Sequence, residues 1–138
     1  MYLPSGKRYA NDKIKGASVR AIDGKYLHVG NQTSLIRQHQ NHILQTGFTD
    51  RLVGQLLDEL KRINLFDEAM IIITADHGKS FQLNEPSRTV WSGNFGDIAF
   101  VPLFIKYPQQ TNGVRDDSNV ETVDILPTIR DVTGAKVL

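Results

Sequence analysis

Apolar side chains recur at three- and four-residue steps between residues 33 and 62, the spacing of one face of an α-helix. A side-chain oxygen of Thr33 or Ser34 can accept the free backbone N–H groups of a first helical turn, and Asn64 can end the helix. The pattern therefore predicts one long helix over residues 33–62. Its stripe consists of Leu35, Ile36, His39, Ile43, Thr46, Gly47, Leu52, Val53, Leu56, Leu57 and Leu60.

Two short apolar runs follow this helix. Residues 69–75 form a continuous apolar and β-branched run, which is typical of a strand buried on both faces. Residues 100–105 predict a second strand, with Pro102 near its start or at a sheet edge. A helix followed by a buried strand is the order of elements in an α/β sheet. We therefore predict an α/β fold in which the two strands are neighbours or near neighbours and the long helix packs on one face.

The rest of the chain carries weaker patterns. Residues 1–31 predict an irregular lead-in with one strand-like stretch at residues 25–29. Residues 77–98 predict a long loop, and loops of this length tend to be functional or mobile. A final short helix is predicted from about Thr122 or Asp124 to Val132, ended by Gly134 in the left-handed conformation.

Composition limits the function classes. A length of 138 residues with 40% apolar and 22% charged residues is typical of one globular domain, which we assign to residues 1–138. The net charge of +1 and its scattered Lys and Arg residues give no reason to expect a nucleic-acid partner. The absence of cysteine excludes disulfides and thiolate metal sites. No apolar run approaches the length of a membrane span.

Asp76, His77 and Gly78 follow the first predicted strand directly. Ligands of open α/β sheets bind outside the carboxyl ends of the strands, where a carboxylate and an imidazole can both reach a divalent cation. Gly78 removes a side chain that would crowd such an ion. In the alternative interpretation, Asp76 caps the following turn and His77 packs on the loop.

The other histidines predict less. His39 and His42 lie three residues apart on the predicted helix, so they share a face and can ligate a metal together. His39 also belongs to the apolar stripe, which favours a partly buried histidine beside a solvent-facing one. His28, on the strand-like stretch, is interpreted as structural.

Several segments together resemble one family, the sulfatase branch of the alkaline phosphatase superfamily. The resemblance runs in order over roughly residues 33–134. Its motifs are Thr49-Asp50-Arg51, Leu65-Phe66-Asp67-Glu68, the run from Met70 to Gly78, the run from Val101 to Pro108 and the run from Thr122 to Gly134. Residues 2–9 and 94–105 further resemble bacterial, membrane-associated proteins of the sulfatase-like hydrolase/transferase group.

This resemblance implies part of an alkaline-phosphatase-like doubly wound sheet with flanking helices. It also implies an active site with one or two metal ions and a nucleophile, in which Asp76 and His77 match the strand-end metal pair. Sulfatases usually carry Asp-Asn at that point and bind calcium. A histidine suits zinc or manganese better, with calcium still possible. The departure favours phosphate-ester chemistry over sulfate-ester chemistry.

The resemblance also implies that the nucleophile and further acidic ligands lie upstream of the matching segments. The chain is expected to be the C-terminal portion of a metal-dependent hydrolase or transferase of sulfate or phosphate esters. It would be inactive alone, since two ligands are too few for a catalytic metal. The whole protein would be anchored in a membrane, with its domain outside the cytoplasm. The alternative is a non-catalytic structural or assembly module. Uncovered apolar surface predicts self-association in either case.

Overall fold

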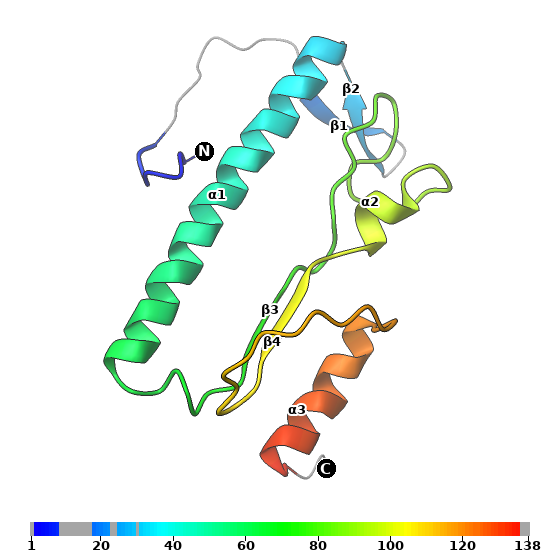
Figure 1. Cartoon of the computed structure of the whole chain (residues 1–138). Coiled ribbons are helices and arrows are strands. Elements are labelled where there is room, and N and C mark those ends of the chain that lie inside the picture. The colour runs from blue at the N-terminus through cyan, green and yellow to red at the C-terminus, as the bar shows by residue number, and fades with distance from the viewer. Residues whose placement is uncertain (1, 9–17, 23–24, 30, 136–138) are drawn as a thin grey trace.

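A computed structural model describes residues 2–8, 18–22, 25–29 and 31–135 (Figure 1). A long helix stands beside two separate two-stranded sheets and two shorter helices. The elements in chain order are β1 (Ser18–Ile22), β2 (Lys25–Val29), α1 (Gln32–Arg62), β3 (Ile71–Thr74), α2 (Phe95–Ala99), β4 (Leu103–Lys106), the 3-10 turn η1 (Thr122–Asp124) and α3 (Ile125–Thr133).

Helix α1 confirms the long helix expected from periodicity, but its cap is Asn31 rather than Thr33 or Ser34. The Asn31 side-chain oxygen accepts a hydrogen bond from the Ser34 backbone N–H at 3.0 Å. The Ser34 hydroxyl in turn accepts one from the Asn31 backbone N–H at 3.2 Å. This reciprocal pair satisfies two donors of the first turn, so the helix starts earlier than predicted. Asn64, at φ +59°, ends it as expected.

The first sheet corrects part of the sequence interpretation. Strand β2 confirms the predicted strand-like stretch, but residues 18–22 form a second strand inside what was expected to be an irregular lead-in. The two strands pair antiparallel, with Ser18 opposite Val29 and Ile22 opposite Lys25. Strand β2 also reaches the long loop through a bridge between Leu27 and Pro86.

The second sheet consists of β3 and β4, which confirms these strands as neighbours. They pair antiparallel, with Ile71 opposite Lys106 and Thr74 opposite Leu103. Strand β4 starts after Pro102, which agrees with the preference of proline for strand starts. The described residues form helices and two separate antiparallel sheets of two strands each, so they show the α/β class in part and no doubly wound sheet.

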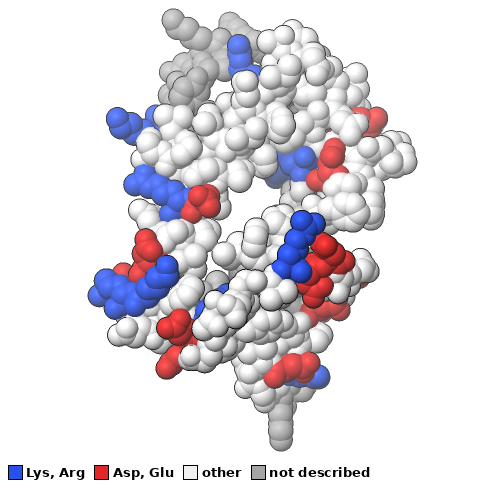
Figure 2. All heavy atoms as spheres, in the orientation of Figure 1, with Lys and Arg blue, Asp and Glu red and all other residues white. Residues whose placement is uncertain are grey.

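The expected packing of the long helix on this sheet is wrong. Helix α1 makes no extensive contact with β3 or β4, and Figure 2 shows an open space between them. Residues 71–73 are therefore only half-buried and Thr74 is exposed, rather than covered on both faces. Helix α1 instead contacts the segment after β3, where the rings of His39 and His42 lie 4.7 Å and 5.4 Å from that of Phe81.

The packed part of the molecule lies where the start of α1, the β1–β2 hairpin and the loop around α2 meet (Figure 1). Leu35 and Ile98 are the buried apolar side chains among the described residues. Farther along α1, residues 2–8 lie against the helix, and the rings of Tyr2 and Phe48 stack with centroids 5.0 Å apart. Much of the apolar stripe nevertheless faces solvent, as at Leu52 and Leu56.

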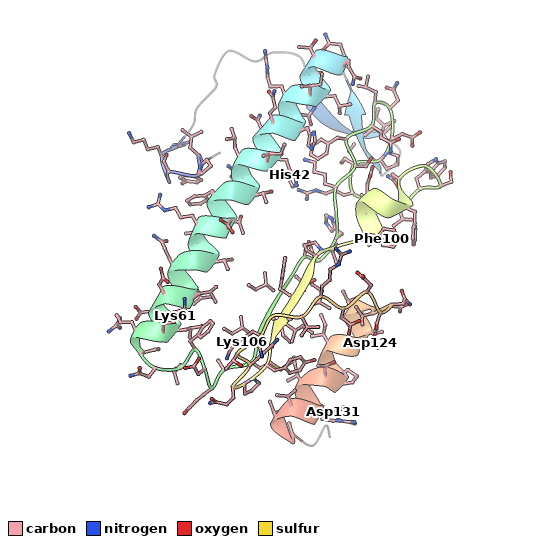
Figure 3. All side chains as sticks on the ribbon, viewed as in Figure 1. His42, Lys61, Phe100, Lys106, Asp124 and Asp131 are labelled. Atoms are coloured by element: carbon pink, nitrogen blue, oxygen red, sulfur yellow. The ribbon has the colours of Figure 1, made fainter. Side chains whose placement is uncertain are left out.

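The connector between α1 and β3 is held by Lys106 at the end of β4. The Lys106 ammonium donates to the carbonyls of Phe66, Asp67 (2.8 Å) and Ala69 (3.0 Å), and it lies 4.8 Å from the centroid of the Phe66 ring. Figure 3 shows Lys106 at the end of the sheet that lies away from α2. These contacts fix where β3 begins.

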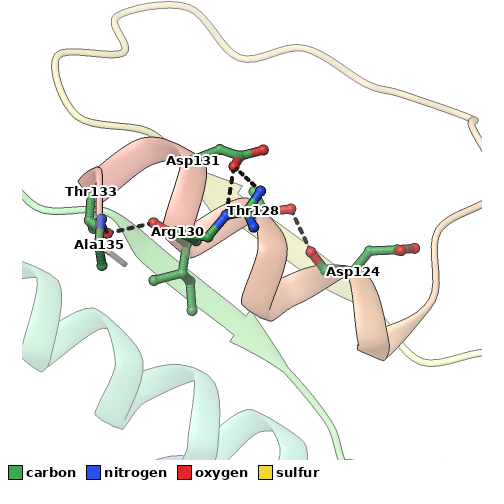
Figure 4. Close-up of polar contacts among 7 residues, drawn as sticks. Asp124, Thr128, Arg130, Asp131, Thr133 and Ala135 are labelled. Carbon is green, nitrogen blue, oxygen red and sulfur yellow. Dashed lines mark hydrogen bonds and ion pairs between the residues drawn. The ribbon is translucent and has the colours of Figure 1, made fainter. Parts of the chain in front are cut away.

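The C-terminal helix agrees with its prediction. It follows η1, and Gly134 ends it in the left-handed conformation, with φ +67°. The Gly134 N–H donates to the Arg130 carbonyl at 2.8 Å. Figure 4 shows that the polar contacts of this segment are local, such as the Thr128 hydroxyl donating to the Asp124 carbonyl at 2.6 Å.

Candidate metal centre

Asp76 and His77 lie just beyond the carboxyl end of β3, where the sequence places them. One carboxylate oxygen of Asp76 accepts the His77 backbone N–H at 2.9 Å. The other lies 3.7 Å from His77 Nε2. The Asp76 side chain is 88% exposed and that of His77 37%. One oxygen of the Asp76 carboxylate thus holds the adjacent backbone N–H, and the other lies beside the imidazole.

The His77 ring has a defined proton position. Its Nδ1 lies 2.7 Å from the Gly78 carbonyl oxygen, which can only accept a hydrogen bond. Nδ1 therefore carries the proton, and in the neutral ring Nε2 keeps a lone pair beside the Asp76 carboxylate. A carbonyl that holds one ring nitrogen while the other remains free is the usual support of a metal-binding histidine. A separation of 3.7 Å also lets both atoms lie about 2.1 Å from one ion.

Gly78 has a different role from the one expected. Its N–H donates to the Ile98 carbonyl at 2.8 Å. A Cβ at Gly78 would lie only 1.9 Å from the carbonyl oxygen of Asp97. Glycine is thus required because the backbone of α2 approaches the loop, and this explains the residue without any ion.

Further hydrogen bonds tie the segment after Gly78 to α2. The carboxylate of Asp97 accepts from the Ser80 hydroxyl at 2.9 Å and from the Gln82 amide at 3.2 Å. The Ser80 N–H donates to the Ser87 carbonyl at 3.1 Å. Ser80 and Ser87 are both buried, and these hydrogen bonds provide partners for their polar groups inside the loop.

Asn94 organises the distal part of the same loop. Its buried amide donates to the carbonyls of Pro86 (2.8 Å) and Thr89 (3.1 Å), and its oxygen accepts the Trp91 N–H at 2.6 Å. The segment predicted as a long loop is therefore cross-linked by hydrogen bonds and includes helix α2. Helix α2 was difficult to predict from the sequence, because it has only five residues and no side-chain cap.

His39 and His42 lie on α1 against Phe81, with ring centroids 4.7 Å and 5.4 Å apart, respectively. Both histidines are exposed, which corrects the expectation that His39 is partly buried. Desolvation by burial lowers the pKa of His42, and the positive charges of Lys79, His39 and Arg88 lower it further. Within the described residues no group of three or more His, Asp or Glu side chains converges as a metal site. Neither the His39–His42 pair nor the Asp76–His77 pair is therefore a complete metal site by itself.

His28 lies on β2, and its side chain is outside the described part of the structure. No helix in the described ranges is both long and apolar enough to cross a membrane.

Comparison with known proteins supports the resemblance. The sulfatase family model matches residues 4–135. An ulvan-active sulfatase of Formosa agariphila is 25% identical over 71% of this chain and 20% of its own length. The choline-sulfatase of Rhizobium meliloti is 29% identical over 71% of this chain and 19% of its own length. Human arylsulfatase K is 29% identical over 62% of this chain and 16% of its own length.

The chain thus spans about a fifth or less of the length of these relatives. No solved structure matches it at a comparable level of significance. The family match covers almost the whole chain and includes the segment, roughly residues 33–134, in which the motifs lie. The chain therefore belongs to the sulfatase family.

Proposed function

We propose that Asp76 and His77 supply two ligands to the metal of a sulfatase-like ester hydrolase. The observation that carries this proposal is the pair itself, in which an imidazole Nε2 with a free lone pair lies 3.7 Å from a carboxylate oxygen at a strand end. When bound, the ion would polarise the ester and stabilise negative charge that develops in the transition state.

The donor set suggests the metal. One carboxylate oxygen and one imidazole nitrogen suit zinc or manganese, whereas calcium prefers an all-oxygen shell. We therefore favour zinc or manganese, and calcium is the alternative. The remaining ligands and the nucleophile would come from outside the described residues, because these residues present no third ligand to the pair. The chain by itself is accordingly proposed to lack turnover.

We infer a sulfate ester as the substrate class of the whole protein. The support is the family match, together with similarity to an ulvan-active sulfatase, an endo-4-O-sulfatase and a choline-sulfatase. A phosphate ester is the second candidate, and His77 favours it, because sulfatases usually carry an asparagine at this point.

Metal binding tests this proposal directly. The chain is titrated with zinc in competition with a chromophoric chelator, beside Asp76→Ala and His77→Ala. The matched control is Asp58→Ala, which removes an exposed carboxylate on α1. We expect weak binding, with a Kd of about micromolar or above, that both variants abolish and the control leaves unchanged. Unaltered zinc binding by Asp76→Ala would exclude the pair as ligands.

Turnover is tested in the whole protein with an aryl sulfate and an aryl phosphate. Asp76→Ala is expected to abolish hydrolysis of the preferred ester with little change in the melting temperature. Retention of most activity would remove both residues from the site. An inactive whole protein that still binds the metal would instead favour the non-catalytic module.

A further inference from the structure

Three basic side chains lie close to the ring of Phe81, and a fourth, Arg88, acts electrostatically on one of them, His42. His39 and His42 contact it from α1, as described above, and Figure 3 shows His42 on the side of α1 that faces the segment after β3. Lys79 Nζ lies 5.1 Å from the centroid of the same ring. Arg88, farther along the loop, is close enough to affect the pKa of His42 electrostatically. We name this group, His39, His42, Lys79 and Arg88 around Phe81, the Phe81 cluster.

No side chain of the Phe81 cluster forms an ion pair within the described ranges. The ion pairs found there, all at 4.0 Å or less, include none of its four members. These pairs are Lys61–Asp58, Arg62–Glu59, Arg115–Asp117 and Arg130–Asp131, and His77–Asp76 joins them only when the imidazole is protonated. The groups that face His42 are the cations Lys79 and Arg88 from the loop and His39 from its own helix. Like charges held together cost free energy that an anion can recover.

The Asp97 carboxylate accepts hydrogen bonds from the Ser80 hydroxyl and the Gln82 amide and forms no ion pair with the cluster. The cluster also remains accessible, because His39, His42 and Arg88 are exposed and Lys79 is half-buried. Guanidinium and ammonium groups are strong donors to oxyanions, and each imidazole offers two N–H donors when it is protonated.

We propose that the Phe81 cluster binds an oxyanion, and that in the whole protein this is a second anionic group of the substrate, separate from the ester at the metal pair. The position supports this, since Lys79 follows His77 by two residues and their Cα atoms are at most about 7 Å apart. The second part rests on the proposed function. It makes the preferred substrate a multiply anionic ester, such as one that carries a further sulfate or a carboxylate.

Inorganic sulfate is the probe for the site itself. The imidazole C–H signals of His42 are followed by NMR during pH titrations of the metal-free chain, with sulfate or with chloride at equal ionic strength. Sulfate is expected to raise the pKa of His42 in a saturable way, since a bound anion favours the imidazolium form. Absence of a saturable change beyond that seen with chloride would overturn the proposal.

Variants locate the bound anion. Lys79→Gln combined with Arg88→Gln is expected to weaken sulfate binding about tenfold. The matched control, Lys61→Gln combined with Arg130→Gln, removes the same charge elsewhere and should leave the affinity unchanged. An equal loss of sulfate affinity in the control would show that net charge alone causes the effect, and it would overturn the proposed site. Asp76→Ala should leave sulfate binding intact, and loss in that variant would assign the anion to the metal pair instead. This arm needs neither metal nor turnover, so it stands apart from the test of the proposed function.

The substrate role is tested with the whole protein on two esters, an aryl monosulfate and an aryl disulfate. The Lys79→Gln, Arg88→Gln variant should raise KM about tenfold for the disulfate and leave KM for the monosulfate unchanged. An equal effect on both esters would overturn the second-group assignment.

Discussion

The backbone of Gly78 and the carbonyl of Asp97 are in such close contact that a Cβ at Gly78 would lie 1.9 Å from the oxygen. We expect Gly78→Ala to destabilise the chain by about 1–3 kcal/mol, because backbone atoms on both sides must shift. Gly54→Ala is the matched control, since nothing lies within 4 Å of a Cβ there. In the interior of α1 that change should stabilise by about 0.5–1 kcal/mol. Urea denaturation measures both, and equal effects would contradict the structure.

Lys106 is expected to contribute more to stability than a surface lysine. Lys106→Met removes an ammonium that donates to three carbonyls, including those of Asp67 and Ala69, and should cost about 2–3 kcal/mol. Lys61→Met, which loses only an exposed ion pair at 3.9 Å, should cost about 0.5 kcal/mol or less. The two variants are compared by the midpoints of their urea unfolding curves, provided that their m-values are equal. A similar midpoint shift in both variants would argue against the three-carbonyl contact.

The cap of α1 gives a third prediction. Asn31→Ala should destabilise the helix start by about 1 kcal/mol, because the Ser34 N–H loses its side-chain acceptor. Asn31→Asp should keep most of the stability, since aspartate caps equally well. Circular dichroism during thermal unfolding measures the two changes. If Thr33 or Ser34 were the cap instead, Asn31→Ala would have almost no effect.

His42 predicts a dependence of stability on pH. Its pKa is lowered from the ordinary 6.5 in the folded chain, so the unfolded state binds more protons between the two values. The free energy of unfolding should therefore increase as pH rises from the folded pKa of His42 to about 6.5. The same contribution is lost as pH falls back toward the folded pKa. Urea denaturation from pH 5 to pH 8 should show a smaller slope for His42→Gln. The effect should be modest because the ring is exposed, and an unchanged slope would refute it.

The exposed stripe of α1 predicts self-association. Leu52 and Leu56 lie four residues apart on one face and are 48% and 57% exposed. Burial of such a face between copies is favourable, so we expect assemblies at micromolar concentration in analytical ultracentrifugation. Leu52→Glu with Leu56→Glu should shift the distribution toward monomer. Val114→Glu with Val120→Glu, which adds the same charge at two loop residues that are 82% and 56% exposed, should not. A monomeric parent chain would disprove the expectation.

Local sequence patterns predicted the regular elements best. The apolar periodicity gave α1 to within one residue at its start, and Gly134 marked the end of α3. Strand β1 was missed, although Asp23-Gly24 between two β-branched stretches is a typical hairpin sequence. The cap was misplaced because neighbouring Asn, Thr and Ser residues can all serve, and only backbone geometry selects one.

Contacts between distant segments could not be predicted in this way. Asp76 and His77 could be placed beside each other from the sequence because they are adjacent and follow a strand, and their role as metal ligands stays a prediction. The Phe81 cluster joins residues about forty positions apart, and no local period indicates such a contact. Gly78 was recognised as important for the wrong reason, since the approach of α2 depends on packing. The coverage of β3 was wrong because a short apolar run does not reveal whether a second layer covers it.

The three carbonyls held by Lys106 have a consequence at the opposite end of β3. Lys106 pairs with Ile71, and the strand leads from there to Asp76 within five residues. If β3 slipped by one residue against β4, the metal pair would move by about 3.3 Å and its side chains would point to the other side of the sheet. Lys106 thus helps to set the position and the orientation of Asp76 and His77, the two proposed ligands, although it does not contact them.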